Sequence, residues 1–299
     1  MRRSCQLAVL ALACVLSVAD GSRAQPISVR DAYDRIVTLP APPHRIIPVY
    51  SSNVELVVAL GLADRIVGIE AFTRYPPEIL SRPSIGGRLG ISVDATVALE
   101  PDLVIVTPAR QAVFQLVDPM ERLGVPIIVL MQRNMAEIFA NIRLLGRATG
   151  VPDRGETLAA SLEGRLAKIT DRIKDLPQPR VVMIRGRVGN GLLLIAQADT
   201  YTGDAIVLAG GRFALSGSSP ISQVSPEAII NSDPDFLLYA GPQRELDDLV
   251  TDPGWNEMRA VKTQRAVVVN RGELLIPGPR TVAGVEHLAA IFHPEVVAP

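Results

Sequence analysis

Aromatic residues are scarce in this chain, since Trp, Tyr and Phe together make 4% of its 299 residues. An excess of charge is also lacking, because 30 Lys and Arg face 31 Asp and Glu. Nucleic-acid-binding proteins normally carry a basic excess and stack bases on aromatic rings, so both shortages argue against that class. Gly (23) and Pro (24) stay below the level of low-complexity chains, which argues against a disordered protein.

Long hydrophobic runs are missing except at the start of the chain. Arg2 and Arg3 precede an apolar stretch from Leu7 to Ala19, and small residues follow up to Ala24. This order is typical of a secretory signal peptide, and the stretch is shorter than the roughly 20 residues of a membrane span. We therefore predict a signal peptide over residues 1–24, cleavage after Ala24, and export to the periplasm.

Cysteine is nearly absent. Both cysteines, Cys5 and Cys14, lie in the predicted signal peptide, so the exported protein has neither disulfides nor thiol ligands for a metal. Lipid attachment at Cys14 is an alternative, but Ala11 stands where such signals usually carry Leu. Without cross-links, the exported chain must be held together by its hydrophobic core.

Short apolar segments and amphipathic helices alternate along the rest of the chain. The segments predict strands at 36–39, 45–49, 66–69, 103–107, 127–130 and 180–184. Helices are predicted at 93–99, 113–123 and 135–149, and from Ser52, whose spacing to Glu55 is that of a capping box. Such alternation is typical of α/β folds with mainly parallel sheets.

One longer helix divides the chain. Apolar residues recur at helical spacing before Pro177, namely Leu158, Leu162, Leu166, Ile169 and Ile173. We predict an α/β fold of two Rossmann-like lobes with central parallel sheets, joined by this helix. The first lobe would span 25–151, the helix 152–177 and the second lobe 178–299. A single sheet with one long crossover helix is the alternative.

A repeat with an offset of 133 residues (225 − 92) supports two lobes. The sequences that begin at Ser92 and Ser225 both read Ser-x-acid-Ala and lead, at the same spacing, to acid-Pro-Asp and an apolar strand. Each serine can cap a helix, and Asp94 and Glu227 then lie in the first turn, where a carboxylate interacts favourably with the helix dipole. The two acids are also suited to docking a partner that has two basic sockets.

Five stretches resemble the periplasmic binding proteins for iron chelates and vitamin B12, the class with a rigid helix between its lobes. In the order of that family they are 45–68, 75–105, 208–211 with the repeat at Ser225, 255–262 and 293–295. The resemblance implies the substrate-binding subunit of an ABC importer, working with a membrane permease and its ATPase subunit. Asp94 and Glu227 match the acids that meet permease arginines, although the family usually has Glu at the first position. We expect a monomer.

Ligands of α/β lobes bind beyond the carboxyl ends of the strands, here between the lobes. Phe72 stands where the resembled corrinoid binder has an aromatic residue in its cleft. Surface loops collect arginine in any protein, but a guanidinium suits carboxylates and catecholates. We therefore expect two or three of the arginines to bind a ferric siderophore. The candidates after strand ends are Tyr50, Phe72, Arg88, Arg110, Arg185, Arg187, Arg271 and Arg280.

Cobalamin and haem are alternative ligands. Neutral cobalamin prefers aromatic walls, and the only tryptophan, Trp255, is predicted in a surface helix. Haem needs an axial ligand such as Tyr75, but haem-binding relatives carry an aromatic residue where this chain has Gly87. The histidines (His44, His287 and His293) lack metal-site spacing, and His293 is predicted at a helix end. We expect no bound metal ion and no cofactor apart from the transported chelate.

Enzymatic motifs are also lacking. Neither G-x-S-x-G nor the phosphate-binding P-loop pattern occurs, and the glycines at 86–90 and 186–191 are interpreted as turns. We therefore expect a binding protein and no catalytic residues. An exported α/β hydrolase is the alternative from another class, and a binding module that feeds a membrane sensor is a further one.

Overall fold

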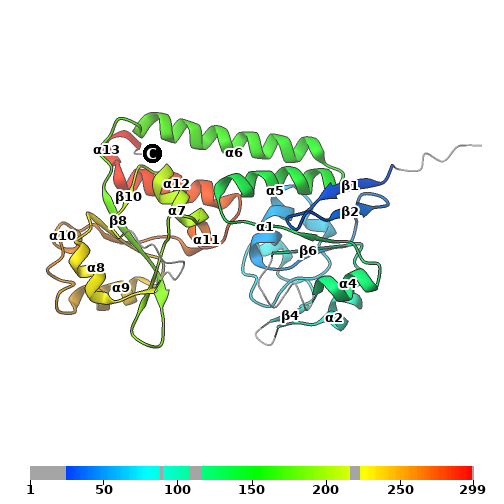
Figure 1. Ribbon diagram of the computed structural model, residues 1–299, viewed down its shortest axis with the longest axis horizontal. Coiled ribbons are helices and arrows are strands. Elements are labelled where there is room, and N and C mark those ends of the chain that lie inside the picture. The colour runs from blue at the N-terminus through cyan, green and yellow to red at the C-terminus, as the bar shows by residue number, and fades with distance from the viewer. Residues whose placement is uncertain (1–24, 88–89, 108–115, 216–222, 298–299) are drawn as a thin grey trace, which may run out of the picture.

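The computed structural model describes residues 25–87, 90–107, 116–215 and 223–297. The chain forms two α/β lobes, and the long helix α6 (Pro152–Ile173) spans both on one side of the molecule (Figure 1). Within the described ranges, no helix is long and apolar enough to cross a membrane. The predicted signal peptide and the candidate residues Arg88 and Arg110 lie outside these ranges.

The first lobe contains a parallel three-stranded sheet with buried strands, as expected for a sheet covered on both faces. Its order is β3 (Ile46–Pro48), β6 (Leu103–Val106), β7 (Ile127–Val129). Two antiparallel pairs accompany it, β1 (Ile27–Arg30) with β2 (Ile36–Leu39) and β4 (Gly86–Gly87) with β5 (Gly90–Ile91). The helices are α1 (Ser51–Ala59), α2 (Val93–Val97), α4 (Asp118–Arg122) and α5 (Met135–Ala148), with short 3-10 turns at Ala63–Arg65 and Pro77–Ile79.

The strand predicted at 66–69 forms only single bridges, between Ile46 and Ile66 and between Ile69 and Ser84. The backbone N–H of Val67 donates to Ile46 O (3.0 Å), whereas that of Ile69 donates to Pro83 O (3.0 Å). The segment therefore changes its partner after two residues, and no continuous ladder forms.

The second lobe contains a sheet in the order β11 (Gln223–Val224), β9 (Leu193–Ile195), β8 (Arg180–Arg187), β12 (Phe236–Tyr239), β13 (Ala266–Val268), with β10 (Arg212–Phe213) also paired to β8. β10, β12 and β13 continue the parallel part, whereas β9 runs antiparallel to β8 because a short turn connects the two. The helices are α7 (Tyr201–Leu208), α8 (Pro226–Ser232), α9 (Gln243–Thr251), α10 (Arg259–Lys262), α11 (Arg271–Leu274), α12 (Arg280–Phe292) and α13 (Pro294–Val297). The predicted two-lobed α/β fold is thus confirmed, with a mixed rather than wholly parallel second sheet.

One apolar core passes from one lobe to the other. Helices α5 and α12 both pack on α6 (Figure 1), and buried residues of all three, among them Ile142, Leu162 and Val285, belong to one cluster. A separate cluster fills the other face of the second sheet and includes Trp255, which is 3% exposed. The predicted surface position of Trp255 is therefore wrong, because the turn after α9 folds its ring into the core.

The two copies of the repeat form the same local structure. Ser92 Oγ accepts a hydrogen bond from Ala95 N (3.1 Å) at the start of α2, and Ser225 Oγ accepts one from Ala228 N (3.3 Å) at the start of α8. Both predicted helix caps are confirmed.

The acid-Pro-Asp part of the repeat holds the start of a central strand. The Asp102 carboxylate accepts the N–H groups of His44 (2.7 Å) and Arg45 (2.8 Å) beside β3. The Asp235 carboxylate accepts the N–H of Arg180 (2.7 Å) at β8. The repeat therefore joins the end of a helix to the neighbouring strand in both lobes.

Candidate ligand-binding site

Tyr50 lies at the carboxyl end of β3, directly before α1. Its backbone has φ 73° and ψ 147°, a conformation that residues with a side chain rarely adopt and that persists only where the surroundings enforce it. Asn53 supplies such a constraint, since its Nδ2 donates to Val49 O (2.6 Å) and its backbone N–H to Tyr50 O (3.1 Å). Burial raises the pKa of the half-buried Tyr50 phenol, and the charge of Glu70 adds to this.

A buried polar network supports the start of α1. Asn53 Oδ1 accepts hydrogen bonds from Thr107 Oγ1 (3.2 Å) and Gln132 Nε2 (3.1 Å). Thr107 follows β6 and Gln132 follows β7, so the network links the carboxyl ends of all three strands of the first sheet. Sequence reasoning missed these residues, because single Asn, Thr and Gln residues in separate segments carry no local signal.

Phe72 and Tyr75 present aromatic surface in the loop after Ile69, with exposed fractions of 51% and 42%. The Phe72 ring lies beside Gly87, since a Cβ on this glycine would be 3.8 Å from Phe72 Cε2. Phe72 therefore provides an exposed aromatic surface beside Gly87.

A β-bulge between Ile184 and Gly186 separates Arg185 from Arg187. Bulges redirect the side chains that follow them. Arg185 lies on the α7 side, where its charge lowers the pKa of Tyr201 against the stronger, raising effect of burial. Arg187 is exposed and turns toward α9, with its Nη2 3.5 Å from the carbonyl oxygen of Glu245. The structure thus does not bring these two predicted residues together.

Arg185 and Arg271 lie together at the carboxyl edge of the second sheet. Arg271 Nη1 donates to Ala240 O (2.6 Å), beyond β12, and is 3.3 Å from Arg185 O. Neither arginine forms an ion pair with a carboxylate of the described residues. This edge therefore carries positive charge that an acidic group can neutralise.

Arg280, by contrast, is paired with Glu55 of the first lobe. Its Nε and Nη2 donate to Glu55 Oε2 (2.8 Å) and Oε1 (2.6 Å), and the Tyr75 ring centroid lies 3.9 Å from the guanidinium carbon. These hydrogen bonds raise the pKa of Arg280, while burial raises the pKa of Glu55 against the opposing effect of Arg280. Since α1 lacks a side-chain cap, the predicted capping box of Ser52 and Glu55 is wrong.

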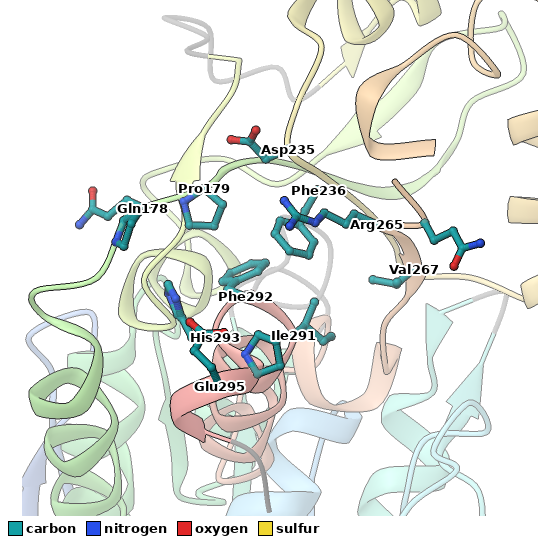
Figure 2. Close-up of a pocket in the computed structure, with 13 residues that line it drawn as sticks. Gln178, Pro179, Asp235, Phe236, Arg265, Val267, Ile291, Phe292, His293 and Glu295 are labelled. Carbon is teal, nitrogen blue, oxygen red and sulfur yellow. The ribbon is translucent and has the colours of Figure 1, made fainter. Parts of the chain in front are cut away.

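Two cavities differ in their position. A cavity of about 140 Å³ lies between the lobes and is lined by Glu55 and Tyr75 from the first lobe and Arg280 from the second. A cavity of about 550 Å³ lies at the opposite edge of the second sheet, at the amino ends of β12 and β13 (Figure 2). There Arg265 covers the Phe236 ring, and His293 ends α12 as predicted. This larger cavity is not part of the candidate site, because the candidate arginines lie at the carboxyl ends of the strands.

Asp94 and Glu227 are exposed in the first turns of α2 and α8, one on each lobe. In Figure 1 both helices lie on the side of the molecule away from α6. A hydrogen bond from its own backbone N–H, supported by Ser225, lowers the pKa of Glu227. Its carboxylate is therefore charged and accessible at neutral pH.

The family model and the relatives that match this chain all describe binding proteins. Residues 46–270 match the model of a family described as periplasmic binding protein. Over 277 residues the chain is 25% identical to the uncharacterized ABC transporter substrate-binding lipoprotein YvrC of Bacillus subtilis, covering 90% of this chain and 86% of YvrC. It is 26% identical to a cobalamin-binding protein of Halobacterium salinarum, covering 92% of this chain and 76% of the relative.

Among solved structures, the periplasmic haem-binding protein RhuT from Roseiflexus sp. RS-1, in its apo form, superposes with a TM-score of 0.72. The two chains are 28% identical, and the match covers 84% of this chain and 98% of RhuT. All three relatives are named as binding proteins, in agreement with the expectation of a non-enzymatic function.

Proposed function

The chain belongs to the periplasmic binding protein family, and from this premise we propose that it binds a metal chelate with acidic groups between its lobes and delivers it to an ABC permease. The substrate-binding role in an ABC importer follows from the family and its relatives. The observation that supports an acidic ligand is the pair Arg185 and Arg271, which lie at one sheet edge and have no carboxylate partner among the described residues.

A ferric siderophore is the first candidate ligand. Carboxylate and catecholate oxygens accept the fixed donors of a guanidinium in paired hydrogen bonds. Arg185 and Arg271 offer two such groups at the same edge of the sheet, where Arg271 Nη1 lies 3.3 Å from the Arg185 carbonyl oxygen. Neutral cobalamin would leave both charges without a partner.

Haem is the second candidate, supported by the aromatic surface of the first lobe. Phe72 and Tyr75 expose about half of their surfaces, and a flat apolar macrocycle can stack on such rings. Its acidic side groups would then meet the arginines of the second lobe. The relative RhuT, named as haem-binding, adds support for this candidate.

Calorimetric titration of the protein without residues 1–24 tests the acidic-chelate proposal. A ferric catecholate, ferric citrate, haem and cobalamin serve as probes. We expect binding of at least one acidic chelate, and a loss of about tenfold or more in affinity when Arg185 and Arg271 are both replaced by Ala. Arg187→Ala is the matched control, because this arginine turns toward α9 and should leave the affinity unchanged. Tight binding of cobalamin alone would contradict the proposal.

We further propose that Asp94 and Glu227 dock the protein on the permease. They occupy equivalent positions of the repeat and extend from the same turn of equivalent helices. Two exposed carboxylates of this kind can each meet an arginine of a two-fold partner.

The export signal at residues 1–24 belongs to the same proposal. A periplasmic binding protein must cross the inner membrane, and the charged start followed by a short apolar stretch provides for this. YvrC is named a lipoprotein, so mass spectrometry of the exported protein should compare cleavage after Ala24 with lipid attachment at Cys14.

A further inference from the structure

The ion pair between Glu55 and Arg280 crosses from one lobe to the other. Glu55 belongs to α1, Arg280 begins α12, and the two residues are separated by 225 positions in the chain. Among the residues that the structure describes, no other ion pair joins an element of the first lobe directly to an element of the second. Its two hydrogen bonds, at 2.8 and 2.6 Å, form the bidentate geometry that fixes a guanidinium in direction as well as distance.

The surroundings enclose this pair. The Glu55 side chain is 2% exposed, and a Cβ on Gly272 would lie 2.7 Å from Arg280 Nη1. The Arg280 guanidinium can lie this close to residue 272 because glycine has no side chain. Tyr75 of the first lobe covers the guanidinium from its face at 3.9 Å, which adds a cation–π contact across the same junction.

A ligand would find little to bind on Arg280. An acidic group could take over its Nε and Nη2 donors only by displacing the buried Glu55 carboxylate, which would then lose its partner at high cost. Arg185 and Arg271, by contrast, have no carboxylate to displace among the described residues. Arg280 therefore differs in this respect from Arg185 and Arg271.

We propose that Arg280 is a positioning residue: its pair with Glu55 holds the two lobes at a fixed spacing and keeps the Tyr75 ring at the junction between them. A cleft held at one spacing does not have to be ordered when the ligand binds, so the pair increases affinity without touching the ligand. The spacing itself does not depend on which ligand is bound. Only the effect on affinity rests on the proposed function.

Distance measurement between the lobes tests the spacing without any ligand. The chain without residues 1–24 contains no cysteine, so Leu123→Cys after α4 and Asp248→Cys on α9 introduce one spin label in each lobe. Both sites are exposed. Pulsed electron paramagnetic resonance then gives the distribution of distances between the labels. We expect Arg280→Ala to broaden or shift this distribution relative to the parent protein.

Arg165→Ala is the matched control. Arg165 of α6 donates to Glu286 of α12 in the same bidentate manner (2.9 and 2.6 Å), but this pair does not reach the first lobe. Its loss should leave the distances unchanged. Because Arg280→Ala leaves a buried carboxylate unpaired, the double variant Glu55→Gln with Arg280→Gln is measured as well. An unchanged distribution in both folded variants would overturn the proposal.

Titration of the same variants with the chelate that the parent protein binds separates two further outcomes. A Kd that is about tenfold higher, together with altered distances between the labels, supports the positioning role. Weaker affinity with unaltered distances would assign Arg280 to direct ligand binding and overturn the positioning role, while the proposed function would stand. If the parent protein binds no acidic chelate, the proposed function is overturned. The distance measurement alone then decides whether the pair fixes the spacing of the lobes.

Discussion

The two copies of the repeat perform the same backbone task with the same kinds of residue. In each, a left-handed residue follows the helix: Glu100, with φ 45°, comes three residues after the end of α2, and Asp233, with φ 38°, directly follows α8. An arginine at the start of the adjacent strand donates to the carbonyl oxygen of this residue: Arg45 Nε at 3.0 Å and Arg180 Nη1 at 3.3 Å. The two lobes therefore share the structure of this turn as well as the sequence pattern.

The copies differ in what else holds them. Arg259 binds the turn of the second lobe, with its backbone N–H 2.8 Å from Asp233 Oδ1 and its Nη1 3.0 Å from Asp235 Oδ1. Glu100 is exposed, and its carboxylate has no partner among the described residues. The backbone turn is therefore common to both lobes, while the side chains around it are adapted to each lobe separately.

The largest expected effect concerns the acids in the first turn. Glu227→Lys should abolish uptake of the ligand and leave its affinity intact, because Glu227 is exposed in the first turn of α8 and is not among the residues proposed to bind the ligand. Uptake into cells that carry the transporter, together with titration of the purified variant, measures both. Asp94→Glu is the companion variant, and we expect it to support uptake at least as well as the parent protein. Undiminished uptake by Glu227→Lys would refute the docking role.

The next effect concerns the aspartates that hold the strands. Asp102→Ala and Asp235→Ala should each lower the free energy of unfolding by about 1–3 kcal/mol, because each removes a charged acceptor of backbone N–H groups at the start of a strand. Urea denaturation of the two variants measures this. A loss in only one lobe would show that the two turns are not energetically equivalent.

A smaller effect of opposite sign distinguishes the two left-handed residues. Glu100→Gly should raise the free energy of unfolding by about 0.5 kcal/mol, because glycine adopts this conformation without strain and little else is lost. Asp233→Gly should lower it, because the contacts with Arg259 disappear. Denaturant midpoints of both variants provide the measurement, and equal shifts would contradict the assigned difference.

The last effect appears only when the pH changes and concerns the histidines of the two lobes. Burial lowers the pKa of His293, so the unfolded chain takes up a proton at a higher pH than the folded one. This contribution to stability is therefore complete above about pH 6.5 and is lost as the pH falls below it, by at most about 1.4 kcal/mol per pH unit. The difference in unfolding free energy between pH 7.5 and 5.5 should shrink in His293→Gln. In His44→Gln, which alters an exposed histidine of the first lobe, it should persist.

Local signals predicted much of the fold. The caps at Ser92 and Ser225, the start of α5 at Met135 and the long helix α6 all follow from residues within one or two turns of one another. These features depend on the spacing of residues that are neighbours in the sequence, so the sequence alone predicts them.

Features that depend on distant partners could not be predicted in this way. The spacing of Ser52 and Glu55 suggested a local cap, but the partner of Glu55 lies on α12. The bulge that turns Arg187 away from Arg185 leaves no mark in the alternation of apolar residues. The 133-residue offset also hides the equivalence of Arg45 and Arg180, because two additional residues separate them.

The core shared by α5, α6 and α12 bears on how the chain folds. Because its buried side chains come from both lobes and from the helix between them, neither lobe can complete its own interior. Loss of the second lobe would leave apolar faces of α5 and α6 in water. The two lobes should therefore unfold in a single cooperative transition, and either half produced alone should aggregate.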